Sequence, residues 1–100
     1  MPTPKNPHVE EKSREIRQQI GARIAELREL KGWSQKDFSG VLHNTVQWIS
    51  LVESGKQNLT LHTLVRIAIK LEVEPADLWQ SPAPKKAKSW GKTGRPRKTS

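Results

Sequence analysis

Cysteine is absent from this chain of 100 residues, and its absence excludes several classes of structure and chemistry. Without thiols there is no disulfide framework, no cysteine nucleophile and no cysteine-rich zinc module. The three histidines, His8, His43 and His62, share no ligand spacing, whereas a structural zinc site needs four clustered ligands. We therefore expect no metal and no other cofactor.

Long apolar runs are also missing. No stretch approaches the roughly 20 apolar residues that cross a bilayer, and the opening MPTPKNPHVEEK lacks the apolar segment of a secretory signal. We expect no membrane partner and a cytoplasmic location, associated with the nucleoid. Ser34, Ser50 and His43 do not form a set of nucleophile, base and orienting group, so we also expect no enzyme.

The net charge of +8 is distributed unevenly along the chain. Residues 83–100 contain no acid and seven bases, Lys85, Lys86, Lys88, Lys92, Arg95, Arg97 and Lys98, which leaves eleven bases against ten acids in the rest. The basic character therefore belongs to the C-terminal tail. Bulk charge is no evidence that the remaining residues bind nucleic acid, although a local positive face could do so.

The apolar pattern predicts where the fold begins. Prolines at positions 2, 4 and 7 and the lack of apolar residues before Val9 predict a disordered arm over residues 1–12. From about Ser13, apolar residues recur at spacings of four and three, as on one face of an amphipathic helix: Ile16, Ile20, Ile24, Leu27 and Leu30. Gly32 is expected to end this helix.

Capping residues predict the remaining helices. Ser34 caps a helix from Gln35 to Leu42, and Asp37 completes a short capping box. Thr45 caps a third helix, to about residue 53, that buries Ile49 and Val52. Thr60 caps a fourth, whose expected buried side is Leu61, Leu64, Val65, Ala68 and Leu71.

Pro75 suits the first position of a short fifth helix that ends at Leu78 and Trp79. Residues 81–100 have little to bury apart from Trp90, so they are predicted to form a disordered basic tail. The predicted fold is thus all-α, a compact five-helix domain over residues 13–80 with disordered tails at both ends. Trp33 and Trp79 are expected in the core or in an interface.

The segment over residues 33–60, WSQKDFSGVLHNTVQWISLVESGKQNLT, resembles the helix-turn-helix of the lambda and 434 repressor family, also called the Xre family. The matching features are Ser34-Gln35, Phe38 and Leu42, Ile49-Ser50, and Glu53 followed by Gly55-Lys56, and the resemblance extends from about Ile20 to Trp79. It implies a lambda repressor-like fold, a transcriptional regulator, double-stranded DNA as the partner and a homodimer. Leu78 and Trp79 are the expected dimer contacts.

The resemblance also implies residue roles, since the family lays the third helix in the major groove. The base-contacting residues would be Val46, Gln47, Ser50 and Leu51. Gln47 could read adenine, and Val46 could touch a thymine methyl group. The phosphate-contacting residues would be Gln35, Thr45, Lys56, Gln57 and Asn58. Glu53 corresponds to a carboxylate that pairs with an arginine of the first helix, here Arg28.

Several positions depart from the family pattern. The turn after the second helix is His43-Asn44 instead of glycine and an apolar residue, although both can adopt turn angles. Val46 and Leu51 stand where the family commonly has a long polar or basic residue. Trp48 stands where the family often has tyrosine, and we expect it to rest against the domain edge instead of acting as a wedge in DNA. Either the readout uses apolar and shape contacts, or the third helix binds a protein partner, as in an antitoxin or a bridging factor.

The tail leaves two further interpretations open. Residues 93–98, TGRPRK, resemble the core of an AT-hook, although Thr93 replaces the usual arginine. Arg95, Arg97 and Lys98 could therefore lie in a minor groove, or they could contact phosphates as a general basic arm. If the tail dominated DNA binding, the protein would be architectural instead of a specific regulator.

Overall fold

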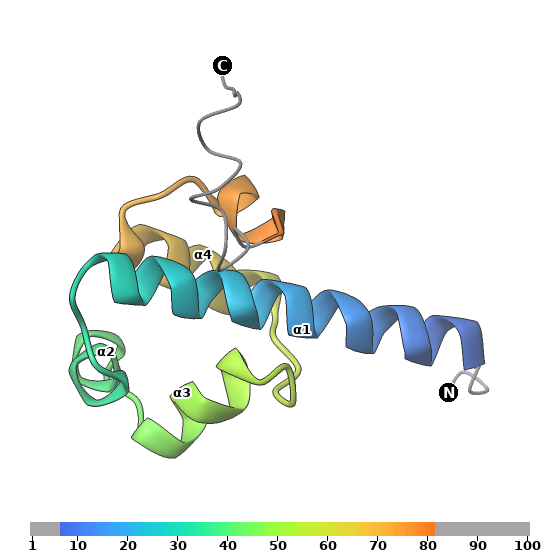
Figure 1. Cartoon of the computed structure of the whole chain (residues 1–100), viewed down its shortest axis with the longest axis horizontal. Helices are drawn as coiled ribbons and strands as arrows, with labels where there is room; N and C mark the ends of the chain where they lie inside the picture. Colours follow the sequence, from blue (N-terminus) through green and yellow to red (C-terminus); the bar gives the residue numbers. More distant parts are fainter. Residues whose placement is uncertain (1–6, 82–100) are drawn as a thin grey trace, which may run out of the picture.

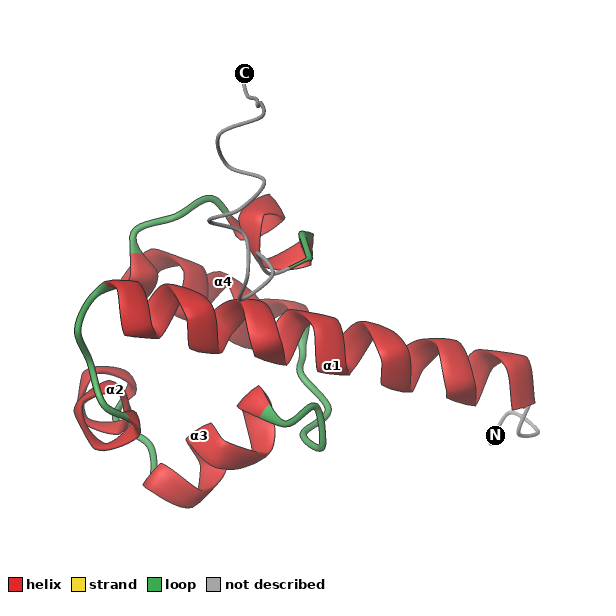
Figure 2. Cartoon of the chain, viewed as in Figure 1, coloured by secondary structure: helices red, strands yellow, loops and turns green. Residues whose placement is uncertain are grey.

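The computed structural model describes residues 7–81, and every element in that range is helical (Figures 1 and 2). The order is α1 (Pro7–Leu30), α2 (Gln35–Leu42), α3 (Val46–Glu53), α4 (Leu61–Leu71) and η1 (Pro75–Trp79). The all-α class is confirmed. The fifth element differs from the prediction, because it is a 3₁₀ helix and not an α-helix. Proline at its start and only five residues of length favour this tighter form.

Helix α1 is longer than predicted. It begins at Pro7 and runs for 24 residues, so the prediction that the whole segment 1–12 is a disordered arm is wrong from Pro7 onward. Pro7 has no N–H to donate, and at the first helical position an N–H would have no partner within the helix. Glu10 in the first turn interacts favourably with the helix dipole. The first turns of α1 project beyond the other helices (Figure 1). Residues 1–6 and 82–100 lie outside the described residues.

The predicted caps of α2, α3 and α4 are confirmed. The side chains of Ser34, Thr45 and Thr60 accept hydrogen bonds from the backbone N–H groups of Asp37, Trp48 and Thr63. Each cap satisfies an N–H that the helix itself cannot pair. The starts of α2, α3 and α4 therefore follow directly from three Ser and Thr residues in the sequence.

A single core joins all five elements. Its buried apolar residues are Ile20, Ile24, Leu27, Phe38, Leu42, Ile49, Val52, Ile67, Ala68, Leu71 and Leu78. Three residues of the predicted apolar faces, Ile16, Leu64 and Val65, are only half-buried. Leu30 and Leu61 are each 76% exposed. They are the last residue of α1 and the first of α4, where a helix extends past its packing partners. Ile67, which is not part of the predicted buried side of α4, is fully buried.

The two tryptophans at the ends of the domain differ. Trp33 packs partly buried against the core and stacks on Phe38, with ring centroids 5.8 Å apart. Trp79 is 55% exposed, whereas its neighbour Leu78 is only 1% exposed. Leu78 is therefore a core residue and not a dimer contact, which corrects the prediction.

Candidate nucleic-acid interface

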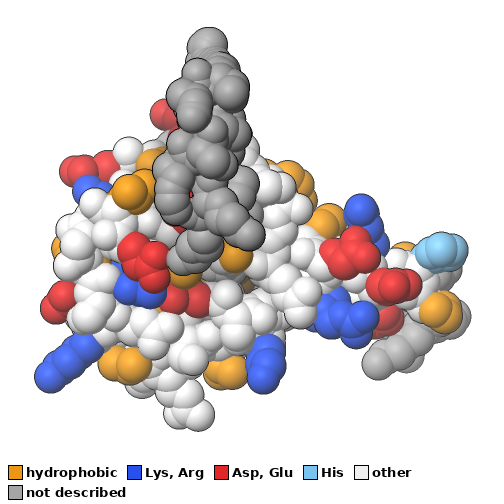
Figure 3. Space-filling model, viewed as in Figure 1, with side chains coloured by type: hydrophobic (Ala, Val, Ile, Leu, Met, Phe, Trp, Pro, Cys, Tyr) orange, Lys and Arg blue, Asp and Glu red, His pale blue; other side chains and the backbone are white. Residues whose placement is uncertain are grey.

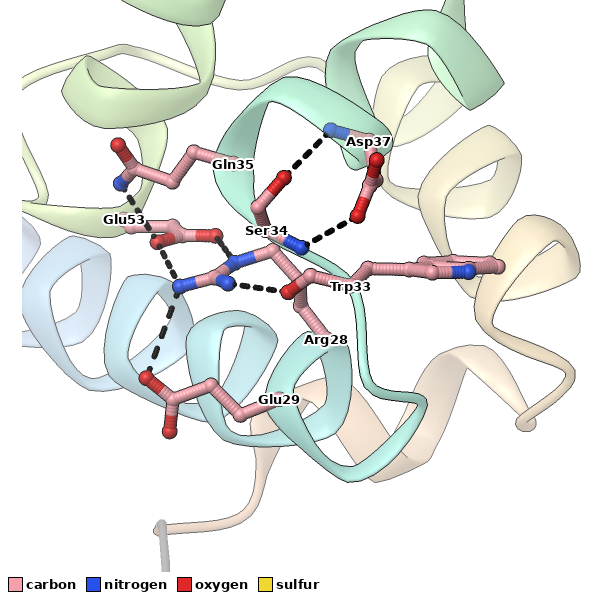
Figure 4. A network of polar contacts seen from close by, with 7 residues as sticks. All are labelled: Arg28, Glu29, Trp33, Ser34, Gln35, Asp37 and Glu53. Atoms are coloured by element: carbon pink, nitrogen blue, oxygen red, sulfur yellow. Dashed lines mark hydrogen bonds and ion pairs between the residues drawn. The ribbon is translucent and has the colours of Figure 1, made fainter.

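A buried ion pair fixes α3 against α1. Arg28 donates through Nε to Glu53 Oε2 over 2.7 Å and through Nη2 to Glu53 Oε1 over 3.2 Å (Figure 4). The two side chains are only 10% and 7% exposed. The hydrogen bond with Glu53 raises the pKa of Arg28 above its usual value. The predicted pairing is thus confirmed, and it sets the position of the C-terminal end of α3.

The same pair also reaches α2 and the segment before it. Arg28 Nη1 donates to the carbonyl oxygen of Trp33 over 2.6 Å, and Gln35 Nε2 donates to Glu53 Oε1 over 3.0 Å. Figure 4 shows these groups converging from α1, α2 and α3. Because one bidentate carboxylate links three elements, the angle between α2 and α3 is held by hydrogen bonds as well as by apolar packing.

The capping box at the start of α2 is complete. Asp37 N–H donates to Ser34 Oγ, and Ser34 N–H donates to Asp37 Oδ2, both over 2.9 Å. The hydrogen bond from the Ser34 backbone, followed by that from its side chain, lowers the pKa of Asp37 below its usual value. This arrangement orders the first turn of α2, where helix N–H groups and the positive end of the dipole favour a phosphate oxygen.

The turn between α2 and α3 is built on His43. Its backbone is left-handed, with φ of 56° and ψ of 48°, and the Asn44 N–H donates to the Ser39 carbonyl oxygen over 2.9 Å. The Asn44 side chain accepts from the Thr45 N–H. Both residues therefore support the turn, as expected, although histidine and not the more tolerant asparagine takes the left-handed position.

Helix α3 has one face in the core and one face outward. Ile49 and Val52 are buried, whereas Val46, Gln47 and Ser50 are exposed. The four predicted base-contacting positions, Val46, Gln47, Ser50 and Leu51, are spaced so that they share one side of the helix. Leu51 is half-buried, so it contributes less surface than the other three.

The outward face of α3 combines apolar and uncharged polar side chains and carries no basic residue. Val46 is 42% exposed. The side-chain amide of Gln47 makes no hydrogen bond to another side chain or backbone group within residues 7–81. Trp48 is partly buried against the core, which confirms that it rests on the domain edge. Figure 3 shows hydrophobic side chains along the lower edge, where α3 runs in Figure 1, with Lys or Arg at both ends of that edge.

The predicted phosphate-contacting residues bracket α3. Thr45 precedes it, exposed, and its hydroxyl can still donate while it caps the helix. Lys56 and Asn58 follow α3 and are exposed, whereas Gln57 is half-buried. Gln35 uses one amide hydrogen on Glu53, so only its second hydrogen is left for a phosphate.

Sequence reasoning missed the residues that hold the loop after α3. Gly55 is buried with φ of +80°, and a Cβ there would lie within 2.8 Å of the Gln18 backbone nitrogen. Arg17 Nε donates to the Gly55 carbonyl oxygen over 3.1 Å. The periodic pattern placed Arg17 only on a polar face of α1. No local signal connects it to a loop that lies 38 positions along the chain.

The comparison with protein families decides the identity of this arrangement. A family model described as helix-turn-helix matches residues 24–78, which is more than half of the chain. The chain belongs to this helix-turn-helix family. The lambda repressor-like resemblance is thereby confirmed. The chain is a DNA-binding regulator of the helix-turn-helix type and not an enzyme.

Solved structures agree with the family. The helix-turn-helix chain is similar to the restriction-modification controller protein C.AhdI from Aeromonas hydrophila, with 31% identity and a TM-score of 0.58 over 61% of this chain and 92% of that one. It also shares the fold of a hypothetical transcription factor, NHTF, from Neisseria, at 24% identity and a TM-score of 0.64, over 70% and 80% of the two chains. No curated protein matches the chain.

Two features are absent from residues 7–81. That range contains no group of three or more His, Cys, Asp or Glu side chains placed to hold a metal ion. It also contains no helix of the length and hydropathy needed to span a bilayer. The predicted tail contacts, Arg95, Arg97 and Lys98, lie outside the described residues.

Proposed function

We propose that this protein is a sequence-specific transcriptional regulator that reads DNA with α3 in the major groove. The observation that supports it is the two-sided construction of α3. One side is fixed by Ile49, Val52 and the Arg28–Glu53 pair, and the other presents Val46, Gln47 and Ser50 to solvent. A rigid helix with an outward face is what base readout requires.

The two kinds of contact are separable by mutation. Gln47→Ala should weaken binding at one base position by about 1–3 kcal/mol and relax preference there, because a glutamine amide pairs with the adenine edge. Lys56→Ala is the matched phosphate variant, and it should weaken all sequences alike and reduce the salt slope by about 1. Titrating a panel of single-base variants of a selected site measures both. Equal effects of the two changes on every site would contradict base reading by α3.

A protein-binding role of α3 is the second candidate, and the exposed apolar part of its outward face favours it. Val46 is 42% exposed, and α3 has no basic residue to attract phosphate. The variants Val46→Arg and Leu51→Arg discriminate the two roles, with affinity for duplex DNA as the measurement. A gain in affinity would mean that the native surface is not adapted to DNA, whereas a loss supports apolar readout of bases.

We further propose a homodimer that binds two half-sites about one DNA turn apart, acting in the cytoplasm on the nucleoid. With Leu78 in the core, an exposed stripe on α4 is the better candidate surface. Leu61 and Ile69 are 76% and 63% exposed and lie on the same side of the helix. Ile69→Asp should shift sedimentation toward the monomer, whereas Lys70→Asp, its exposed neighbour, should not.

A further inference from the structure

An apolar groove lies beside the loop that follows α3. The projecting half of α1, the residues before α4 and the end of η1 enclose about 510 Å³. Its walls include Ile16, Ile20, Leu59, Leu64 and Trp79, and Trp79 is 55% exposed. This volume is in the range of sites that bury a ligand-sized group, and open apolar surface of this kind usually has a partner.

The groove is connected to the proposed DNA-contacting loop. Asn58 lines it, directly after Lys56 and Gln57. Arg17 also lines it and donates to the Gly55 carbonyl oxygen over 3.1 Å. The wall of the groove and the loop at the end of α3 are therefore held together, so that a group bound in the groove would sit next to the DNA backbone.

The chain itself supplies a suitable occupant. The described residues end at Ser81, two residues after Trp79 at the groove. Trp90 is the only aromatic residue in the segment 82–100, and every other residue there is Pro, Ala, Gly or polar. The nine residues that follow Ser81, up to Trp90, reach about 30 Å when extended. So short a tether gives an effective concentration on the order of millimolar, so that even weak docking would be populated.

The polar rim is compatible with this occupant. Lys12 and Arg17 line the groove, and an indole ring binds favourably beside cations as well as apolar groups. The projecting part of α1 also carries Glu10, Glu11 and Glu15, which offset its bases. The segment is therefore not repelled by the surface on which it would dock.

We propose that Trp90 binds in this groove and anchors the basic tail beside residues 56–58. The four bases that follow, Lys92, Arg95, Arg97 and Lys98, then start next to the DNA-contacting loop and reach about 25 Å further along the duplex. Anchoring converts the tail from a general basic arm into an extension of the interface of α3. The DNA part of this inference rests on the proposed function, whereas the docking part does not.

Docking is tested in the full chain without DNA. Because the protein has no cysteine, Ser89→Cys gives a single site for a nitroxide label. We expect strong broadening of the Ile16, Leu59 and Leu64 amide signals and none at Val41 on α2. Adding Trp90→Ser should remove most of that broadening. Equal broadening with and without Trp90 would overturn the proposal.

Mixing separates docking within one chain from docking between two. One sample mixes equal amounts of ¹⁵N-enriched protein without the nitroxide and ¹⁴N protein that carries it. We expect the amide signals of the groove residues to stay sharp in this mixture. Broadening there would identify a second copy as the occupant and overturn the proposal. Dispersed amide spectra of each variant verify that the domain is folded.

The DNA consequence has its own measurement. At a selected site, Trp90→Ser should weaken binding by about tenfold without changing site preference, whereas Trp90→Phe should retain most affinity. If the native chain selects a site and Trp90→Ser binds that site as tightly as the native protein does, the anchoring is refuted but the proposed function is not. Failure of the native chain to select any site would instead refute the proposed function.

Discussion

At the scale of single residues, the Arg28–Glu53 pair matters for stability because breaking it would leave one buried charge without its partner. Removing the carboxylate leaves a guanidinium with 10% exposure and only Glu29, 3.6 Å away, as an ionic neighbour. Losing one partner of a buried pair costs more than the pair contributes as a whole. The cost therefore measures mainly the penalty of leaving the Arg28 guanidinium buried without its partner.

We expect Glu53→Ala to lower the free energy of unfolding by about 3 kcal/mol. Glu29→Ala is the matched control, since its side chain is 57% exposed and should cost less than about 1 kcal/mol. Urea denaturation of both variants measures the difference. Similar losses for the two glutamates would show that the pair with Glu53 is not special.

The capping box at α2 predicts a pH dependence. The pKa of Asp37 is lowered in the folded state, so its stabilising effect is complete above the unfolded pKa, near 3.8, and disappears as the pH falls through the lower folded pKa. The native protein should therefore melt at higher temperature than Asp37→Asn at pH 6, and the two should converge in strong acid. A melting difference that stays constant with pH would contradict this role.

At the scale of elements, the sequence predicted most of what local signals encode. Ser34, Thr45 and Thr60 marked the starts of α2, α3 and α4, because a cap needs only a hydroxyl at one position. It did not predict the extra turns of α1 before Ser13, where few apolar residues mark the helix. It also missed contacts between distant residues, such as Arg17 with Gly55.

Gly21 is another residue whose role depends on a contact with a distant part of the chain. It lies in α1 against the end of α3, where a Cβ would be 2.7 Å from the Glu53 carbonyl oxygen. Helical periodicity gives no reason for glycine at this position. The crossing of α1 and α3 explains the glycine, because only a hydrogen atom fits between the Gly21 Cα and the backbone of α3.

Gly21→Ala should therefore destabilise the protein by about 2 kcal/mol through overpacking. Gly40→Ala is the matched control, since Gly40 lies inside α2 with no atom within 4 Å of its missing Cβ. That change should be neutral or stabilise by up to about 1 kcal/mol, as alanine favours helix. Thermal or urea unfolding should show a loss of stability for Gly21→Ala and none for Gly40→Ala, and two similar losses would count against the close crossing.

At the scale of the whole molecule, charge and readout are separated. Residues 7–81 contain ten bases and ten acids, whereas residues 83–100 contain seven bases and no acid. The domain can therefore add little general attraction to DNA beyond local groups such as Lys56. In the proposed function, site preference comes from the shape and side chains of α3, and much of the salt-dependent affinity comes from the tail.

Selection of binding sites from random duplex DNA, at two salt concentrations, tests this separation most directly. The full chain and residues 1–82 are compared, since every core residue lies between Ile20 and Leu78. We predict one enriched two-fold motif for both forms, with the short form showing a salt slope smaller by up to about 6 because seven bases are missing. No motif, or only A·T-rich enrichment that disappears with the tail, would contradict reading by α3.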